Sequence, residues 1–164
     1  MGLTLDLLKL LAEAKVEFVL IGGMAAVIHG SPRITEDTDV CAPLDDANIQ
    51  RIASALQSYH PRFRFHPKLP PLPTEPAALH GFRTLNLETD LGKIDVLSEV
   101  TGVGGYDDVK KHSIVVAVGG ISISVLDIDT LIVSKAAAGR LKDKLAIPEL
   151  EAIRSHLRQK TESK

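Results

Sequence analysis

Residues 21–40 read IGGMAAVIHGSPRITEDTDV, in which the glycine pair Gly22-Gly23 and the acids Asp37 and Asp39 are separated by thirteen residues. Side chains at positions i and i+2 of a strand lie on the same face, so both acids face the same way if residues 37–42 form a strand. Two carboxylates about 4 Å apart repel each other by about 4 kcal/mol at an effective dielectric near 20. We therefore expect this pair to bind a divalent cation, and magnesium prefers such hard oxygen ligands.

A third acid, Asp95, interrupts a later apolar run in which Ile94 and Val96 are expected on a buried face. A covered and unpaired acid is costly, so Asp95 needs a partner. An isolated D-x-D pair is more often a turn or a solvent-facing position than a site. If Asp95 lies beside Asp37 and Asp39, three carboxylates can serve one metal site.

The glycine pair adds a second signal to the acids. Glycines between a strand and a helix let backbone amides approach a phosphate, and a helix N-terminus favours negative charge. On their own, Gly22 and Gly23 are better explained by a tight turn than by phosphate binding. The chain has no Gly-Lys-Ser/Thr of a P-loop, no G-x-G-x-x-G of a dinucleotide fold and no calcium-loop spacing of an EF-hand.

Length and composition predict a single domain over residues 1–164 with its own apolar core, because 164 residues with 45% hydrophobic content are enough for one. The longest early apolar run is strand-sized and no signal segment is evident, so we expect a cytoplasmic protein with no membrane partner. The single cysteine, Cys41, excludes an internal disulfide and is best explained as a small buried hydrophobe.

Charge is unevenly distributed along the chain. The net charge of −2 argues against a generally basic nucleic-acid binder, yet residues 135–164 carry 8 Lys/Arg against 4 Asp/Glu. This basic tail fits either contact with phosphates or an ordinary solvated helix.

Periodicity and turn signals predict alternating helices and strands, with two C-terminal helices within residues 126–160. The expected helices are 3–14, 24–29, 45–59, 127–141 and 148–157, and the expected strands are 16–21, 37–42, 82–88, 93–99, 114–118 and 121–125. Gly119-Gly120 is typical of a two-residue hairpin turn. Residues 66–76 hold five of the nine prolines and are expected to form a stiff surface loop, either a substrate rim or a plain insertion.

Four further residues are candidates for contact with phosphate or acceptor. Arg33 and Thr35 lie in the loop just before the paired acids. Lys135 and Lys142 are expected two turns apart on one helical face, where ordinary solvated lysines are the alternative. Arg140 and Asp143 have the spacing of a surface ion pair.

These motifs together resemble those of the polymerase-β-type nucleotidyltransferase superfamily. The string Ile21-Gly-Gly through Gly30, followed by Arg33-x-Thr35-x-Asp37-x-Asp39 and the later Asp95, is similar to small bacterial members, including AbiEii-like toxins. Later segments, around residues 97–106 and 126–143, resemble blocks of single-domain members, so the resemblance covers nearly the whole chain.

The resemblance implies an α/β (α+β) fold, in which a mixed sheet is flanked by helices as in the polymerase-β palm. It implies two magnesium ions held by Asp37, Asp39 and Asp95, with Asp95 also as general base. It implies binding of a nucleoside triphosphate such as ATP, with Gly22 and Gly23 against phosphate. Family members usually carry a larger helical domain for the acceptor, so a partner, a second subunit or the acceptor itself is expected to complete the cleft.

Two functions follow as hypotheses. The first is a magnesium-dependent nucleotidyltransferase that modifies a hydroxyl of tRNA, a protein or a small molecule, including the toxin role of a toxin–antitoxin pair with an antitoxin or homodimer partner. The second is a catalytically silent module that binds nucleotide or another protein. Intact acids at all three positions favour the first, because binding alone does not require them.

Overall fold

A computed structural model describes residues 2–66, 68 and 71–164. At its centre is a seven-stranded sheet with the strand order β3-β4-β5-β2-β1-β9-β8. Its strands are β1 (Val19–Ile21), β2 (Asp37–Cys41), β3 (Arg62–Phe63), β4 (Thr84–Thr89), β5 (Gly92–Leu97), β8 (Ser113–Val118) and β9 (Ile121–Leu126). The sheet is mixed, as predicted, because β2 runs antiparallel to β1 and parallel to β5. A small separate sheet pairs β6 (Glu99–Val100) with β7 (Gly104–Gly105).

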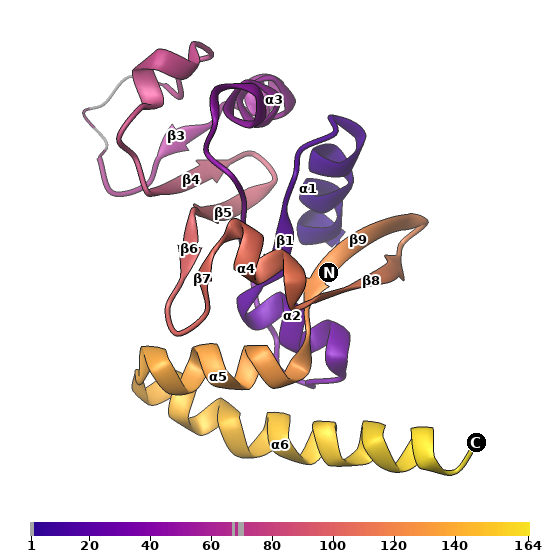
Figure 1. Ribbon diagram of the computed structural model, residues 1–164. Coiled ribbons are helices and arrows are strands. Elements are labelled where there is room, and N and C mark those ends of the chain that lie inside the picture. Colours follow the sequence, from indigo (N-terminus) through magenta and orange to yellow (C-terminus); the bar gives the residue numbers. More distant parts are fainter. Residues whose placement is uncertain (1, 67, 69–70) are drawn as a thin grey trace.

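Helices flank this sheet (Figure 1). They are α1 (Gly2–Glu13), α2 (Gly22–His29), α3 (Asp46–Leu56), α4 (Tyr106–Lys111), α5 (Ile128–Ala138) and α6 (Leu141–Glu162), with short 3-10 turns η1 (Gln57–Tyr59) and η2 (Pro76–Leu79). Figure 1 shows α5 and α6 packed side by side on one side of the molecule, with α1 and α3 toward the opposite side. Within the described ranges, every helix is too short or too polar to cross a membrane.

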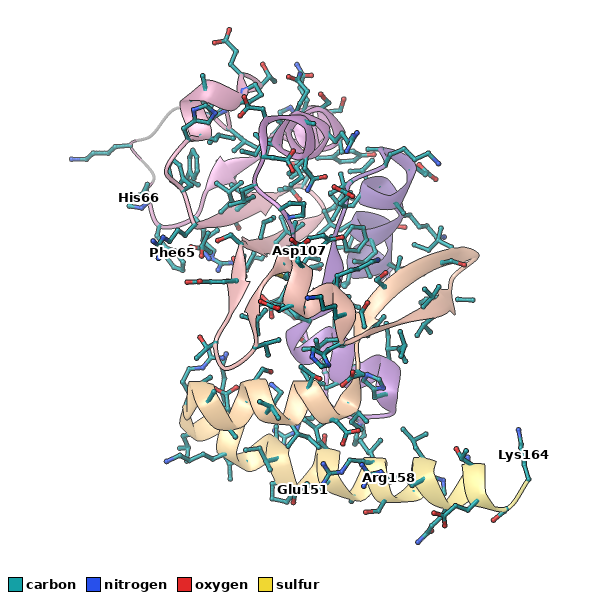
Figure 2. All side chains as sticks on the ribbon, viewed as in Figure 1. Phe65, His66, Asp107, Glu151, Arg158 and Lys164 are labelled. Atoms are coloured by element: carbon teal, nitrogen blue, oxygen red, sulfur yellow. The ribbon has the colours of Figure 1, made fainter. Side chains whose placement is uncertain are left out.

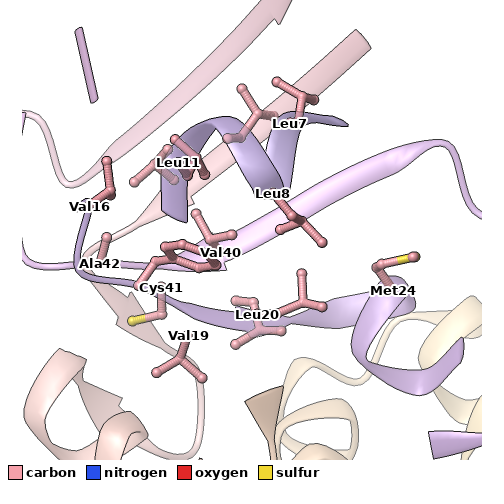
Figure 3. Close-up of a cluster of buried hydrophobic side chains, with 14 of the residues drawn as sticks. Leu7, Leu8, Leu11, Val16, Val19, Leu20, Met24, Val40, Cys41 and Ala42 are labelled. Carbon is pink, nitrogen blue, oxygen red and sulfur yellow. The ribbon is translucent and has the colours of Figure 1, made fainter. Parts of the chain in front are cut away.

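The core forms where the leucine face of α1 meets the sheet (Figure 3). Leu7, Leu8 and Leu11 have helical spacing and are at most 1% exposed, and they pack in one cluster with Leu20 of β1 and Val40 of β2. Full burial of each such side chain stabilises the fold by about 1.5–3 kcal/mol. Strand β2 is thereby fixed on its apolar face, which leaves its acidic face directed away from this cluster.

Strand β1 is shorter than predicted, because Val16–Phe18 do not join the sheet. The N–H of Val16 donates to the carbonyl of Leu11 at the end of α1, and the N–H of Glu17 donates to the side chain of Asn48. The backbone N–H groups of Val16 and Glu17 therefore have hydrogen-bond partners outside the sheet. The apolar, β-branched composition of residues 16–21 favours a strand and gives no sign of these partners.

The last helix differs from the prediction at its beginning. Helix α6 begins at Leu141 instead of at Pro148, which lies inside it. A proline within a helix removes one backbone hydrogen bond. In the turn before the proline, the carbonyl of Leu145 accepts a hydrogen bond from the Arg33 guanidinium at 3.2 Å.

The proline-rich stretch 66–76 lies partly outside the described residues, at Pro67, Leu69 and Pro70. Its later part is anchored, because Leu72 is buried and Leu79 of the following turn η2 is also buried. The short elements β3, β6, β7 and α4 were not predicted, since two-residue strands and a six-residue helix give no readable period.

Candidate functional site

The two strands that carry the acids lie next to each other in the sheet. In the parallel pairing of β2 with β5, Asp39 is directly opposite Asp95, and Ile21 of β1 is opposite Asp39 on the other side. On β2, Asp37 is exposed and Asp39 partly buried, whereas Thr38 and Val40 point into the core. The predicted same-face arrangement of Asp37 and Asp39 is thus present, with Asp95 beside it.

Gly22 is a glycine because the acid leaves no room for a side chain. Its backbone has φ +67°, and a Cβ there would overlap Oδ2 of Asp39. At Gly23, a Cβ would come within 3.1 Å of the Thr35 hydroxyl oxygen. The start of α2 therefore lies directly against Asp39, and the first backbone N–H groups of a helix lack partners within the helix.

The surroundings of Asp39 disfavour its charged form. Burial, and then the negative charges of Asp95 and Asp37, raise the pKa of Asp39 from 3.8 to about 6. Lys142 and Lys135 act in the opposite direction and lower that pKa, but they do not offset the rise. An ionised Asp39 is accordingly disfavoured here unless positive charge is added.

A divalent cation fits this donor set in its chemistry. Three carboxylates supply hard oxygen ligands, and their mutual repulsion is the feature that a cation relieves. Among the residues that the structure describes, no three acidic, histidine or cysteine side chains are gathered closely enough to form a finished metal cage. Asp37, Asp39 and Asp95 instead line one cavity side by side.

The facing wall of the cavity is basic and is organised by a buried acid. Asp143 is 1% exposed, and its Oδ2 accepts a hydrogen bond from Nε of Arg140 at 2.6 Å. Nζ of Lys135 lies 3.6 Å from Oδ1 of the same carboxylate. Hydrogen bonding and charge pairing with Arg140 outweigh burial and lower the pKa of Asp143. Asp143 is therefore an ionised anchor for both cations.

Lys135 and Lys142 reach the cavity differently from the prediction. Lys135 lies on α5 and Lys142 on α6, because Gly139, with φ +66°, ends the first helix. They therefore do not share one helical face. Both nevertheless line the cavity that holds Asp37 and Asp39. The expected surface pair of Arg140 and Asp143 does form, with the acid in the interior and not on the surface.

Arg33 and Thr35 lie beside the glycine pair. Nε of Arg33 pairs with Glu149 of α6 at 3.1 Å, and the Ser31 hydroxyl donates to the same carboxylate. This pairing lowers the pKa of Glu149, chiefly through the Ser31 hydrogen bond. Arg33 thus ties the loop before β2 to α6, while remaining about half exposed toward solvent.

All nine predicted site residues line one of two adjoining cavities, with volumes of about 270 and 200 Å³. The larger contains Asp95, and the smaller contains Gly23, Arg33 and Thr35. Shared between them are Gly22, Asp37, Asp39, Lys135 and Lys142. The structure thus shows that these residues lie together around the two cavities. Their roles in metal and phosphate binding stay predictions.

Sequence reasoning missed two partners of Asp95. Nη2 of Arg64 lies 2.8 and 2.9 Å from the two carboxylate oxygens, and the Asn86 amide donates to Oδ1 at 2.9 Å. Asn86 could have been found, because a hairpin turning at residues 90–91 places it opposite Asp95. Arg64 could not, since it follows a two-residue strand next to the proline-rich stretch.

Comparison with known proteins supports the fold. No family model matches the chain, and no curated protein matches it either. Among solved structures, it is similar to TM1012 from Thermotoga maritima, a protein provisionally described as a nucleotidyltransferase. The TM-score is 0.57 at 17% identity, over 94% of this chain and 92% of that one. The chain therefore has the mixed-sheet fold of this nucleotidyltransferase-type structure.

Proposed function

We propose that this chain is a magnesium-dependent nucleotidyltransferase, which transfers a nucleoside monophosphate from a nucleoside triphosphate to an acceptor hydroxyl. The observation that carries the proposal is the side-by-side pairing of Asp39 and Asp95, directly against Gly22 and facing Lys135 and Lys142 across one cavity. An acidic wall suits cations and a basic wall suits phosphates, and a metal–triphosphate complex presents both. The fold shared with TM1012 agrees with this proposal.

Asp37, Asp39 and Asp95 are the residues that would hold magnesium. When bound, two such ions supply Lewis-acid activation of the attacking oxygen and neutralise charge that develops on the phosphates. The raised pKa of Asp39 is consistent with this assignment, because added positive charge favours its ionised form.

In the proposed reaction, the acceptor oxygen forms a bond to the α-phosphorus. The bond from that phosphorus to the bridging oxygen of the β-phosphate breaks, and pyrophosphate leaves. Lys135 and Lys142 bind phosphate oxygens, and the backbone N–H groups at the start of α2 add hydrogen bonds. The acceptor proton goes to Asp95, whose Oδ2 accepts only the Arg64 hydrogen bond within the described part of the chain.

The nucleotide and the acceptor follow less directly from the site. ATP and a tRNA, protein or small-molecule hydroxyl are the expected substrates, and a toxin–antitoxin role remains part of the proposal. Helix α6 carries Arg154, Arg158 and Lys160 beyond the cavity, which is compatible with an RNA acceptor. Arg154 and Arg158 each pair with Asp129 of α5, however, so part of this charge is already compensated.

The test is transfer of label from α-³²P nucleoside triphosphates to RNA or protein in a cell extract with magnesium. The native chain should label a discrete acceptor. Asp39→Asn should lower the rate more than about a hundredfold, because a metal ligand is lost and even the outer partners of such ligands change activity by 10- to 100-fold. The matched control is Glu151→Gln on the exposed part of α6, whose rate should stay within twofold (Figure 2). Equal labelling by the native chain and Asp39→Asn would refute the proposal.

The silent-module hypothesis makes a different prediction in the same experiment. A module that only binds nucleotide would show magnesium-dependent triphosphate binding by calorimetry and release no pyrophosphate. That result would support a nucleotide-binding site at this position and contradict the proposed transferase activity.

A further inference from the structure

Arg64 is a partly buried arginine that the proposed reaction does not use. It follows β3 directly, and its backbone N–H donates to the carbonyl of Asn86 at 2.9 Å, which continues the pairing of β3 with β4. Its side chain reaches past Asn86 to Asp95, where Nη2 bridges Oδ1 and Oδ2 at 2.8 and 2.9 Å. Both side chains of this pair are 18% exposed.

The guanidinium is restrained on a second side by an aromatic ring. The central carbon of the Arg64 guanidinium lies 4.8 Å from the ring centre of Phe65, within the range of a cation–π contact. Figure 2 shows Phe65 and His66 at the periphery of the molecule, where the chain leaves β3. The strand pairing, the ring and the carboxylate therefore hold Arg64 in one orientation.

The order of the strands decides on which side of Asp95 this arginine lies. From β3 to β2, the sheet places Arg64, Asn86, Asp95 and Asp39 in a row. Arg64 thus approaches Asp95 from the side opposite Asp39. Asn86 and Asp95 line the cavity, whereas Arg64 is not among its lining residues. The arginine accordingly leaves the cavity side of the carboxylate open.

We propose that Arg64 is a positioning residue that acts through Asp95. Arg64 fixes the orientation of the Asp95 carboxylate from the side away from Asp39. Its positive charge also offsets the repulsion between Asp95 and Asp39. The oxygens of Asp95 are thereby positioned to bind a cation on the cavity side. This inference rests on the proposed function. Partners behind metal-ligating carboxylates commonly change metal affinity by 10- to 100-fold when they are removed.

The test is Mn²⁺ binding, measured by calorimetry and by the loss of the free-ion electron paramagnetic resonance signal, without nucleotide or turnover. Arg64→Met keeps an unbranched side chain and removes the guanidinium charge with its contacts to Asp95 and Phe65, and it should weaken Mn²⁺ binding about tenfold. Arg64→Lys keeps the charge but lacks the planar guanidinium, so an intermediate affinity is expected. The matched control is Arg62→Met, which breaks the exposed pair with Glu88 and should change Mn²⁺ affinity less than twofold.

A double mutant separates positioning from general damage to the fold. In an Asp95→Asn background, Arg64→Met should produce no further loss of Mn²⁺ affinity, because its route of action is already removed. A full additional loss there would overturn the inference, as would unchanged or tighter Mn²⁺ binding by Arg64→Met alone. If the native chain and Asp39→Asn bind Mn²⁺ equally, or neither binds it, the metal site and the proposed function fail together, which is a distinguishable result.

Discussion

The two walls of the cavity treat charge in opposite ways. On the strand side, Asp37, Asp39 and Asp95 are neighbours of like charge, and burial, followed by the charges of Asp95 and Asp37, raises the pKa of Asp39 to about 6. On the helix side, a single buried acid, Asp143, pairs with both Arg140 and Lys135. The charges of the acidic wall are therefore balanced only when a cation binds, whereas the cations of the basic wall are already paired with an acid of the protein, Asp143. This difference predicts that removing the negative charge of Asp143 lowers the stability of the fold. Removing the negative charge of Asp39 should instead raise the stability of the metal-free chain and weaken cation binding.

The largest effect on stability is expected at the basic wall. Asp143→Asn removes the charge that Arg140 and Lys135 share, and it should lower the free energy of unfolding by about 3 kcal/mol, because cations are left without a partner around a buried position. Urea unfolding measures this. The comparison control is Asp90→Asn, which breaks an exposed pair with His60 and should change stability by less than about 0.5 kcal/mol. Equal effects of the two variants would show that the basic wall is not internally anchored.

The acidic wall should make the stability of the metal-free chain depend on pH, through Asp39. The pKa of Asp39 is higher in the folded chain, at about 6, than its ordinary value of 3.8, so the folded state binds more protons between these values. Metal-free stability should therefore fall as pH rises from about 4 to 6, by about 2 kcal/mol, and stay lower above that.

Asp39→Asn removes the titrating group and serves as the control for this pH dependence. Chemical unfolding at a series of pH values in the presence of a chelator should show a smaller fall for this variant than for the native chain. Identical pH profiles would contradict a raised pKa of Asp39 in the folded chain.

An effect of similar size on stability is expected at Gly22, where the start of α2 meets Asp39. Gly22→Ala should lower the free energy of unfolding by about 2 kcal/mol, since it combines a positive φ with overlap against Asp39. Gly120→Ala in the β8–β9 turn has φ +84° and nothing within 4 Å of the new Cβ, so only the backbone strain of about 1 kcal/mol remains. The difference between the two melting curves isolates the contact with Asp39, and no difference would mean that this contact is unimportant.

For the acidic wall, the sequence predicted both the residues and much of their arrangement, whereas for the basic wall it predicted the residues but not how the two helices bring them together. The i, i+2 spacing of Asp37 and Asp39 and the apolar neighbours of Asp95 fix which way these side chains point once the strands form, and the parallel register of β2 and β5 then pairs Asp39 with Asp95. Lys135 and Lys142 were expected on one helix, but Gly139 separates α5 from α6. Their common position depends on how two helices pack, which spacing alone does not determine.

The partners of Asp95 show the same limit. Asn86 follows from hairpin register, which is local in sequence. Arg64 depends on an edge strand of two residues that pairs with β4, and no periodic signal marks such a strand. Long-range contacts made by short irregular segments are thus the part of this site that only the three-dimensional structure provides.

The central claim, that the acidic wall is completed by a divalent cation, is tested most directly by melting the native chain and Asp39→Asn at pH 8 with and without 10 mM MgCl₂. Ligand binding to the folded state raises its stability, so magnesium should raise the melting temperature of the native chain. Without magnesium, Asp39→Asn should be the more stable protein, and its melting temperature should not respond to the ion. A native chain unaffected by magnesium, or a variant with an equal shift, would contradict the account.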